Sequence, residues 1–301
     1  MPTVVVTADL PGLAPRPDWT LAGPDGWRDA LPGADALLCV LTDRIDAALL
    51  DTAPRLRAVG TVSVGYDHVD LAACAARGVV VVNTPGVLAE PTADLAFGLL
   101  VAAARLFTSA EATLRDGGWT GWTPGAFLGR DVHGATLGLV GYGRIGQAVA
   151  TRAAGFGMTV LHHTRHDTCV AGWLDSLPEL LRRSDFVSLH VPLTVDTRRL
   201  IGARELALIG PDGVLVNTSR GPVVDEAALA TALHERTLFA AGLDVYEDEP
   251  AVHPGLLASP YAVLLPHVGT ATRATRAAMT RLAVSGVAAV LAGGTPPNAV
   301  T

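Results

Sequence analysis

Short runs of β-branched and other apolar residues alternate along this chain with segments of helical character. Four such runs precede residue 85, namely TVVVTADL, ADALLCVLT, LRAVGTVS and GVVVVNTP. Six more follow, namely TLGLVG, MTVLHH, DFVSLHV, GVLVNTS, AGLDV and AVLLPH. A parallel sheet that is covered by helices on both sides requires strands that are apolar on both faces. The pattern therefore predicts an α/β protein with two doubly wound parallel sheets.

One of these runs leads directly into a glycine-rich loop. TLGLV is followed by Gly141, Tyr142, Gly143, Arg144, Ile145 and Gly146, and then by a helical pattern. GxGxxG is a weak signal by itself, because a chain with 32 glycines produces such spacings by chance. A strand before it and a helix after it make it specific, since they bring backbone and a positive helix end to a pyrophosphate. We interpret it as a dinucleotide loop; the alternative is a glycine turn between core elements.

The order of the runs predicts where the domains begin and end. Pro91 can open the apolar segment PTADLAFGLLVAAARLF as a helix, because its missing N–H costs nothing in a first turn. The amphipathic segment from Thr272 to Leu291 is expected to return to the first domain. We therefore expect a flavodoxin-like substrate domain in residues 1–95 and 276–301, with a Rossmann nucleotide-binding domain in residues 96–275 inserted in it.

The residues after the second strand of the nucleotide domain bear on the choice of coenzyme. In an NAD site, an Asp or Glu at the end of this strand binds the ribose 2′-OH. The strand is expected to end at about His163, which places Thr164 at that position and Arg165 after it. A hydroxyl and a guanidinium can bind a 2′-phosphate that a carboxylate would repel. The pattern predicts a preference for NADPH.

Asp167 is the rival candidate for the missing acid, and it would restore the use of NADH. It lies three residues beyond Thr164, further into the loop. Three histidines nearby, His162, His163 and His166, add positive charge only at low pH, and at least one is expected to be loop surface.

Composition and charge argue against several other classes of protein. The net charge is −7, from 22 basic and 29 acidic side chains, and every basic one is arginine, so a polybasic surface for nucleic acid or an anionic membrane is not expected. A chain without lysine has neither Schiff-base chemistry nor a P-loop. Cys39, Cys74 and Cys169 are odd in number and lack CxxC spacing, which favours core or surface thiols in a reducing compartment.

Neither end of the chain reads as a targeting or membrane segment. MPTVVVTADL has no basic n-region and resembles a first strand. The apolar segment from Ala277 to Gly293 is interrupted by Arg281 and is too short to span a bilayer. We expect a cytoplasmic protein.

Three further stretches place polar groups after apolar strands. They are NTSRGPVVDE with Arg220, GLDVYEDEP with Glu249 and LLPHVGTAT with His267. The carboxyl ends of parallel strands line the ligand crevice, so the three groups can converge there. Each has a simpler explanation when taken alone, such as a packing histidine or a solvated turn acid.

Together with the glycine loop, these stretches resemble the D-isomer-specific 2-hydroxyacid dehydrogenases, and most of all the glyoxylate and hydroxypyruvate reductases. The matching segments are SVGYDHVD (63–70), NTPGVLAEPTADLAFGLLVAAARL (83–106), GYGRIGQAVA (141–150), LHVPLT (189–194), NTSRGPVVDE (217–226), GLDVYEDEP (242–250) and PHVGTAT (266–272). The resemblance implies reduction of a small 2-keto acid to the D-2-hydroxy acid with NAD(P)H, by a homodimer.

The resemblance also implies a role for each matching residue. Arg220 matches the arginine that holds carboxylate and carbonyl oxygens with two parallel bonds. His267 matches the acid/base, which protonates the carbonyl oxygen as hydride arrives at carbon. Glu249 matches its partner, and a carboxylate there favours the charged imidazole, so reduction should fade as the pH rises. Val64 and Gly65 match the backbone donors to the substrate carboxylate.

Further coenzyme contacts are implied by position in the matching segments. Besides the glycine loop and His163, Thr164 and Arg165, they fall on Val191, Pro192, Thr197, Thr218, Ser219, Asp244 and Gly269. No metal ligand is expected.

The stretch from Ser109 to Arg130 is rich in Gly and Trp and resembles the family's dimerisation arm, at about residues 107–130. In glyoxylate-reducing members an aromatic residue of this arm can reach the partner's active site. We align Ala126 with that residue. This alignment predicts a wider pocket that accepts bulkier keto acids as substrates, unless Phe127 or Trp122 takes the place of the aromatic residue.

Two alternative functions stay open. One is an NADH-dependent dehydrogenase for another, bulkier 2-hydroxy acid. The other is a dinucleotide-sensing regulatory or corepressor protein, which the presence of Arg220, Glu249 and His267 disfavours.

Overall fold

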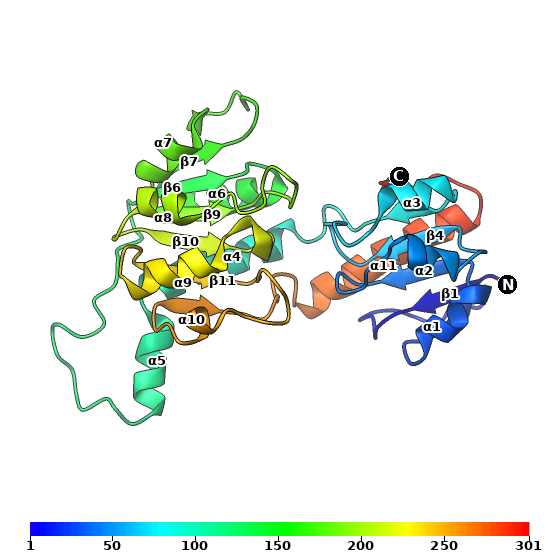
Figure 1. Cartoon of the computed structure of the whole chain (residues 1–301), viewed down its shortest axis with the longest axis horizontal. Coiled ribbons are helices and arrows are strands. Elements are labelled where there is room, and N and C mark those ends of the chain that lie inside the picture. Colours follow the sequence, from blue (N-terminus) through cyan, green and yellow to red (C-terminus); the bar gives the residue numbers. More distant parts are fainter. Residues whose placement is uncertain (301) are drawn as a thin grey trace. The chain divides into compact units, whose positions relative to one another are not determined.

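The computed structural model describes residues 1–300, and its strands form two separate parallel sheets (Figure 1). Residues Met1–Leu88, with the segment from Thr270 onward, form one compact unit, and Ala89–Gly269 form the other. The boundaries expected at 95/96 and 275/276 would cut two helices, α4 (Ala89–Ala104) and α11 (Arg273–Leu291). A helix packs as one rigid body, so each unit keeps its helix whole and the division falls just before it.

The first unit is built on a sheet of order β2-β1-β3-β4-β5, in which all neighbours are parallel. The strands are β1 (Thr3–Val6), β2 (Thr20–Ala22), β3 (Ala36–Cys39), β4 (Ala58–Thr61) and β5 (Val80–Val82). This order is that of flavodoxin-like sheets, as predicted. Strand β2 was not predicted, because three partly exposed residues at a sheet edge carry no apolar run.

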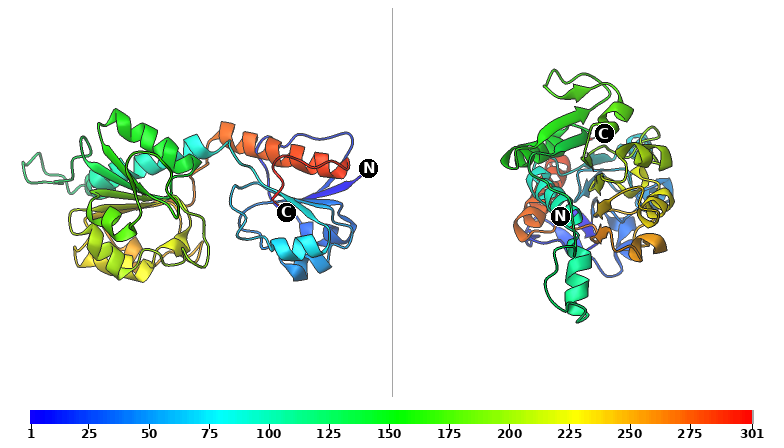
Figure 2. Two further views of the ribbon diagram at one scale, coloured as in Figure 1. Left: turned by 90° about the horizontal axis from the view of Figure 1, so that it is seen from above. Right: turned by 90° about the vertical axis from the view of Figure 1, so that its left-hand side faces the viewer.

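Helices cover both faces of this sheet (Figure 2). Helix α11 packs on β3, β4 and β5, and the short helices α2 (Ala47–Asp51) and α3 (Leu71–Ala76) lie on the other side. The remaining short elements of the unit are α1 (Trp27–Ala30) and the 3-10 turn η1 (Leu31–Gly33). The start of α11 is confirmed at Thr272, whose hydroxyl caps the helix by accepting from the Thr275 amide at 3.1 Å.

The second unit contains a parallel sheet of order β12-β11-β10-β9-β6-β7-β8. Its strands are β6 (Thr136–Val140), β7 (Thr159–His163), β8 (Trp173–Leu174), β9 (Phe186–Leu189), β10 (Val214–Asn217), β11 (Ala240–Leu243) and β12 (Ala262–Leu264). The order matches the Rossmann arrangement with one added edge strand, and it reverses between β6 and β9, where such sheets bind ligands. Two-residue β8 was not predicted, since it is too short to give a periodic signal.

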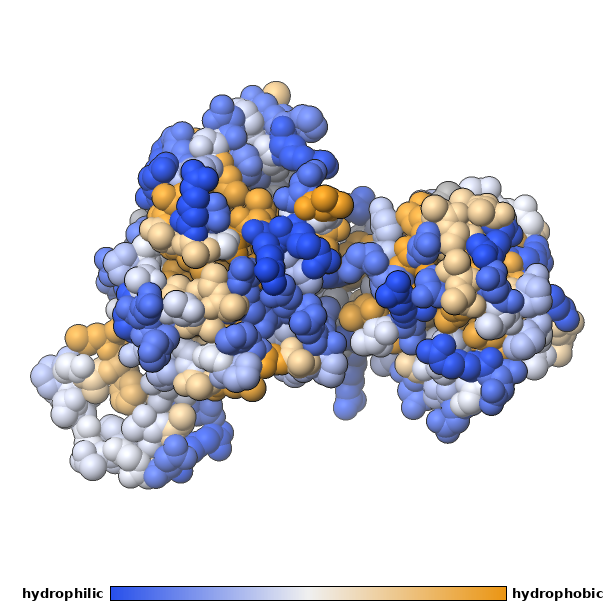
Figure 3. Space-filling model, in the orientation of Figure 1, coloured by the Kyte–Doolittle hydropathy of each residue, from blue (hydrophilic) through white to orange (hydrophobic). Residues whose placement is uncertain are grey.

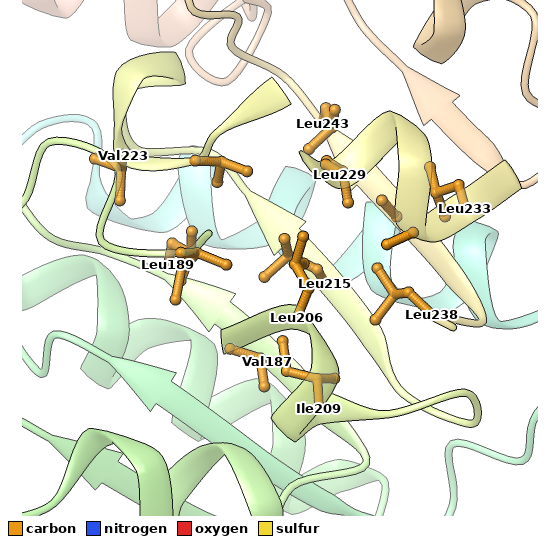
Figure 4. Packing of buried hydrophobic residues seen from close by; sticks show 14 of the residues in the cluster. Val187, Leu189, Leu206, Ile209, Leu215, Val223, Leu229, Leu233, Leu238 and Leu243 are labelled. Atoms are coloured by element: carbon orange, nitrogen blue, oxygen red, sulfur yellow. The ribbon is translucent and has the colours of Figure 1, made fainter. Parts of the chain in front are cut away.

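Helices of the second unit lie on both faces of its sheet. The helices of this unit are α5 (Phe107–Arg115), α6 (Arg144–Gly155), α7 (Leu177–Arg182), α8 (Ala203–Ile209), α9 (Glu226–His234) and α10 (Pro254–Leu257), besides α4 and the 3-10 turn η2 (Gly221–Val223), and α5 has no buried residue. Leu215 of β10 packs with α8 and α9 on one face (Figure 4), whereas its neighbours Val214 and Val216 pack with α4 and α6 on the other. The predicted burial of both strand faces is thereby confirmed.

The arm expected at about 107–130 begins as helix α5 and continues without helix or strand, and none of its residues is buried. Figure 3 shows pale and orange residues along it. Its exposed large apolar side chains are Phe107, Leu114, Trp119, Trp122, Phe127 and Leu128. Across residues 1–300 no single helix is long and apolar enough to cross a membrane; α4 and α5 pass that test only as a pair, which is bent by 66°.

Candidate active site

The carboxyl edge of the seven-stranded sheet carries all the coenzyme residues predicted from the sequence. The glycine loop follows β6. His163 is the last residue of β7, and Thr164 and Arg165 follow it. Val191 and Pro192 follow β9. Thr218 and Ser219 follow β10, Asp244 follows β11 and Gly269 follows β12. Thr197 lies in the loop after β9, where its hydroxyl donates to the Pro192 carbonyl at 2.6 Å and accepts from the Thr194 amide at 2.8 Å. That hydroxyl therefore shapes the loop.

The glycine loop is built so that its backbone lies open to a ligand. Gly141 has a φ of +96°, and a Cβ there would lie 2.5 Å from the His190 carbonyl oxygen, so only glycine fits. A Cβ on Gly143 would meet no atom within 4 Å, and α6 begins at the next residue with its positive end toward the loop. The buried Thr218 hydroxyl also lacks a hydrogen-bond partner within residues 1–300. These features fit a bound dinucleotide.

Strand β7 ends at His163, which confirms the predicted position of Thr164. The Thr164 hydroxyl donates to the His166 carbonyl at 2.6 Å and accepts from the Trp173 indole nitrogen at 3.1 Å. Its only proton is therefore committed within the protein. Arg165 is exposed beside it. Asp167, the rival acid, uses one carboxylate oxygen to accept from the Cys169 amide at 2.8 Å, as a turn residue does.

The histidines near this strand end differ in their surroundings. His162 is buried, stacks on Tyr142 with ring centroids 3.9 Å apart, and shares a 2.7 Å hydrogen bond with Thr168. Burial lowers the pKa of His162, which outweighs the opposing effect of Asp167, so His162 belongs to the neutral core. His163 instead bonds the Leu174 carbonyl through Nδ1 at 2.9 Å, and His166 is exposed as loop surface.

His267 and Glu249 form a direct pair at this edge. The His267 Nδ1 lies 2.8 Å from Glu249 Oε2, and each side chain is about one quarter exposed, at 25% and 27%. Burial favours the neutral carboxyl, but the bond and charge of His267, the Tyr246 amide and the Arg220 charge outweigh it and hold the pKa of Glu249 below its usual range. With Nδ1 turned to the carboxylate, Nε2 is the nitrogen that can give or take a proton.

The backbone at His267 is held in an uncommon conformation. Its φ is +54°, in the left-handed region that non-glycine residues rarely adopt. Asp244, which is 1% exposed, accepts hydrogen bonds from the next two amides, Val268 at 2.7 Å and Gly269 at 2.8 Å. Burial raises the pKa of Asp244, and these bonds only partly oppose it. Asp244, predicted as a coenzyme contact, thus also fixes the loop that carries His267.

The segment with Arg220 is packed against the segment with Glu249. Asn217 organises the first: its Oδ1 accepts from the Ser219 amide and hydroxyl, at 3.0 and 2.8 Å, and its Nδ2 donates to the Arg220 carbonyl at 3.0 Å. A side chain on Gly221 would collide with the backbone of Tyr246, so the two segments approach as closely as glycine permits. This contact keeps Arg220 near the His267–Glu249 pair.

Glu226 is a site residue that sequence reasoning missed. It is buried, and its carboxylate accepts from the amides of Glu247 and His253, the latter at 3.2 Å, so it ties down both sides of the loop that carries Glu249. In the sequence it reads as an ordinary acid in a helix first turn, next to the true cap Asp225. The one available signal was its place inside a matching segment.

The other predicted groups are placed as follows. Val64 and Gly65 follow β4 in the first unit, at the carboxyl edge of its sheet. The cysteines are free thiols, with Cys39 and Cys74 in the core and Cys169 on the surface, as predicted. Burial raises the pKa of Cys74 to about 11. Among residues 1–300, no group of three or more His, Cys, Asp or Glu side chains is arranged to hold a metal ion.

Comparison with known proteins identifies the family. Residues 97–269 match the family described as D-isomer specific 2-hydroxyacid dehydrogenase, NAD binding domain. The chain belongs to the D-isomer-specific 2-hydroxyacid dehydrogenases. Like its family, it is an NAD(P)-dependent oxidoreductase that binds a nicotinamide dinucleotide.

Several members of this family are similar over most of their length. A glyoxylate reductase of Thermococcus litoralis is 46% identical over 276 residues, covering 88% of this chain and 83% of the relative. One of Korarchaeum cryptofilum is 44% identical, covering 99% and 96%. Among solved structures, an NADPH-dependent glyoxylate/hydroxypyruvate reductase of Sinorhizobium meliloti in complex with NADP and malonate is 36% identical, with a TM-score of 0.87 over 100% of this chain and 97% of that one.

Proposed function

We propose that this dehydrogenase reduces small 2-keto acids of the glyoxylate type to D-2-hydroxy acids and prefers NADPH. The observation that carries the proposal is the His267–Glu249 pair, joined at 2.8 Å beside Arg220 on the coenzyme edge of the sheet. The names of the relatives from Thermococcus litoralis and Korarchaeum cryptofilum support the substrate class. In this proposal the first unit supplies backbone amides to the substrate carboxylate, and the second unit binds the coenzyme and carries Arg220, Glu249 and His267.

Each step of the reduction is assigned to residues of this chain. The glycine loop would hold the dinucleotide, which when bound would supply the hydride. Arg220 holds the carboxylate and carbonyl oxygens of the keto acid with its forked donors. His267 gives a proton from Nε2 to the carbonyl oxygen as negative charge develops there. Glu249, which stays ionised, stabilises the charged imidazole through Nδ1, and the amides of Val64 and Gly65 bind the substrate carboxylate.

The preference for NADPH rests on charge at the end of β7. Arg165 is exposed there, and the position at the strand end carries a hydroxyl in place of a carboxylate. Because the Thr164 proton is committed to the His166 carbonyl, we assign recognition of the 2′-phosphate mainly to the Arg165 guanidinium. Asp167 faces its own turn amide, which argues against its acting as the ribose acid.

The arm supports a homodimer. Six large apolar side chains stand exposed on residues 107–128, a surface that needs a partner to be covered. We propose that a second copy of this chain covers it. Because Ala126 aligns with the aromatic residue that reaches the active site in glyoxylate-reducing relatives, we also expect bulkier keto acids to be accepted as substrates.

The test is a matrix of initial reduction rates. Glyoxylate, hydroxypyruvate and phenylpyruvate are each offered with NADPH and with NADH, to the unchanged protein and to His267→Ala. We expect turnover of the small acids, faster with NADPH, and loss of turnover in His267→Ala with NADPH affinity nearly intact by fluorescence titration. Faster turnover with NADH would refute the coenzyme preference, and near wild-type turnover in the variant would remove His267 from the mechanism.

A further inference from the structure

In the loop that carries Val64 and Gly65, three successive carbonyls, those of Ser63, Val64 and Gly65, accept hydrogen bonds from groups of the first unit. The Ser63 carbonyl accepts from the Thr84 amide at 2.9 Å, and the Val64 carbonyl accepts from Asn83 Nδ2 at 2.8 Å. The Gly65 carbonyl accepts from the Ser63 hydroxyl at 2.6 Å. Within residues 1–300 the amides of Val64 and Gly65 donate to no protein acceptor. The loop is therefore bonded through its acceptors, and its donors are left for a ligand.

Because peptide groups are planar, these bonds to the carbonyls also fix the direction of the neighbouring N–H groups. The bonds around Val64 and Gly65 are trans, so each N–H points opposite to the carbonyl of the residue before it. Holding the Ser63 carbonyl thereby sets the direction of the Val64 N–H. In the same way, Asn83 sets the direction of the Gly65 N–H by holding the Val64 carbonyl.

A hydroxyl relay supports the same loop, and its direction follows from counting protons. Ser63 donates its only hydroxyl proton to the Gly65 carbonyl. In the 2.7 Å bond between the Ser63 and Thr61 hydroxyls, Thr61 is therefore the donor and Ser63 the acceptor. Thr61 then accepts from His68 Nε2, 2.9 Å away, and this count assigns the ring hydrogen to Nε2. The relay runs in one direction, from His68 through Thr61 and Ser63 to the Gly65 carbonyl, so the Thr61 and Ser63 hydroxyls have no proton left for the Val64 carbonyl.

Asn83 is itself clamped by a residue near the far end of the chain. The Asn298 Nδ2 donates to the Asn83 carbonyl at 2.6 Å, and the Asn83 amide donates to the Asn298 carbonyl at 3.2 Å. The two asparagines are 6% and 5% exposed. A buried amide side chain with its backbone fixed on both sides has little freedom to leave the Val64 carbonyl.

We infer that Asn83 is a positioning residue for the substrate carboxylate. Its Nδ2 fixes the peptide between Val64 and Gly65 so that the Gly65 N–H is presented to the keto acid, and Asn298 holds Asn83 in place. The inference rests on the proposed function, in which these amides bind the carboxylate. Asn83 and Asn298 would then contribute to substrate affinity although neither side chain contacts the substrate.

The first variant is Asn83→Leu, which keeps the approximate shape of the side chain and removes its donor. We expect the KM for glyoxylate to rise about tenfold, the fold-change that corresponds to one lost hydrogen bond, with kcat changed less and the KM for NADPH unchanged. Asn298→Ala leaves Asn83 in place but loosens it, and a smaller rise in the same KM is expected. This second variant keeps the inference testable if Asn83→Leu folds poorly.

The matched control is Thr84→Val. Thr84 is the next residue and fully buried. Valine keeps the backbone amide that holds the Ser63 carbonyl, and the threonine hydroxyl has no hydrogen-bond partner within residues 1–300, so the substitution removes no bond to the loop. We expect an unchanged KM for glyoxylate. An unaltered KM in folded Asn83→Leu, or an equal rise in the KM for NADPH, would overturn the inference alone. Absence of glyoxylate turnover by the unchanged protein would overturn the proposed function, and the inference with it.

Discussion

Replacement of Glu249 by glutamine tests the electrostatic half of the proposed mechanism. The substitution preserves size but removes the charge that faces His267 Nδ1 at 2.8 Å. In the unchanged protein, the Glu249 carboxylate accepts from His267 with one oxygen and from the Tyr246 amide with the other, at 3.1 Å. The glutamine carbonyl can serve only one of these donors, so the charged imidazole loses an ionic partner and gains at most a neutral one.

The loss of stabilisation of the charged imidazole depends on the difference between a hydrogen bond to a charged group and one to a neutral group. A bond to a charged group contributes about 1.5–3 kcal/mol and a neutral one about 1 kcal/mol. Both side chains are about one quarter exposed, at 25% and 27%, so solvent screening places this pair at the lower end of the range. The charged imidazole loses about 1.5 kcal/mol and regains between none and about 1 kcal/mol, which leaves a net loss of about 0.5–1.5 kcal/mol. The midpoint, about 1 kcal/mol, corresponds to roughly 0.7 pH unit.

Reduction uses the protonated imidazole of His267, and Glu249 stabilises this form. Because the pKa of Glu249 lies below its usual range, the carboxylate is charged at neutral and alkaline pH. In Glu249→Gln the alkaline limb of kcat/KM for glyoxylate reduction should therefore move to lower pH by roughly 0.7 unit. A profile that superimposes on the wild type, or moves to higher pH, would refute the reasoning.

Three further substitutions address the other parts of the site. Arg220→Lys keeps the charge but not the fork, so kcat/KM for glyoxylate should fall on the order of 100-fold; a loss below about threefold would argue against bidentate binding. Thr164→Asp places a carboxylate at the end of β7 and should lower the NADPH-to-NADH ratio of kcat/KM at least about tenfold, whereas an unchanged ratio would show that this position does not face the 2′ group. Glu226→Gln sets an amide donor against a backbone N–H, so the free energy of unfolding in urea should fall by about 1–3 kcal/mol; equal stability would mean that these two bonds contribute little.

Much of the fold follows from local patterns in the sequence. Apolar runs of β-branched residues mark the central strands, because a doubly covered parallel sheet needs both strand faces apolar. The start of α11 follows from Thr272, whose hydroxyl caps the next turn. The end of β7 at His163, and so the place of Thr164, follows from where the apolar run stops. Signals of this kind lie within a few residues of the feature that they predict.

Other features depend on partners that are remote in the sequence. Edge strands β2 and β8 form because a neighbouring strand offers free backbone groups, and two or three residues carry no pattern of their own. The domain boundaries lie before α4 and α11 because each helix packs whole on one unit.

The sequence by itself determined which chemical groups this protein has and which strand ends carry them. Only the tertiary structure decided how those groups are held. Glu226 meets the backbone of His253 27 positions away, and Asn298 meets Asn83 215 positions away. A buried carboxylate or amide must find hydrogen-bond partners wherever folding places it, and no local pattern records which ones it will meet.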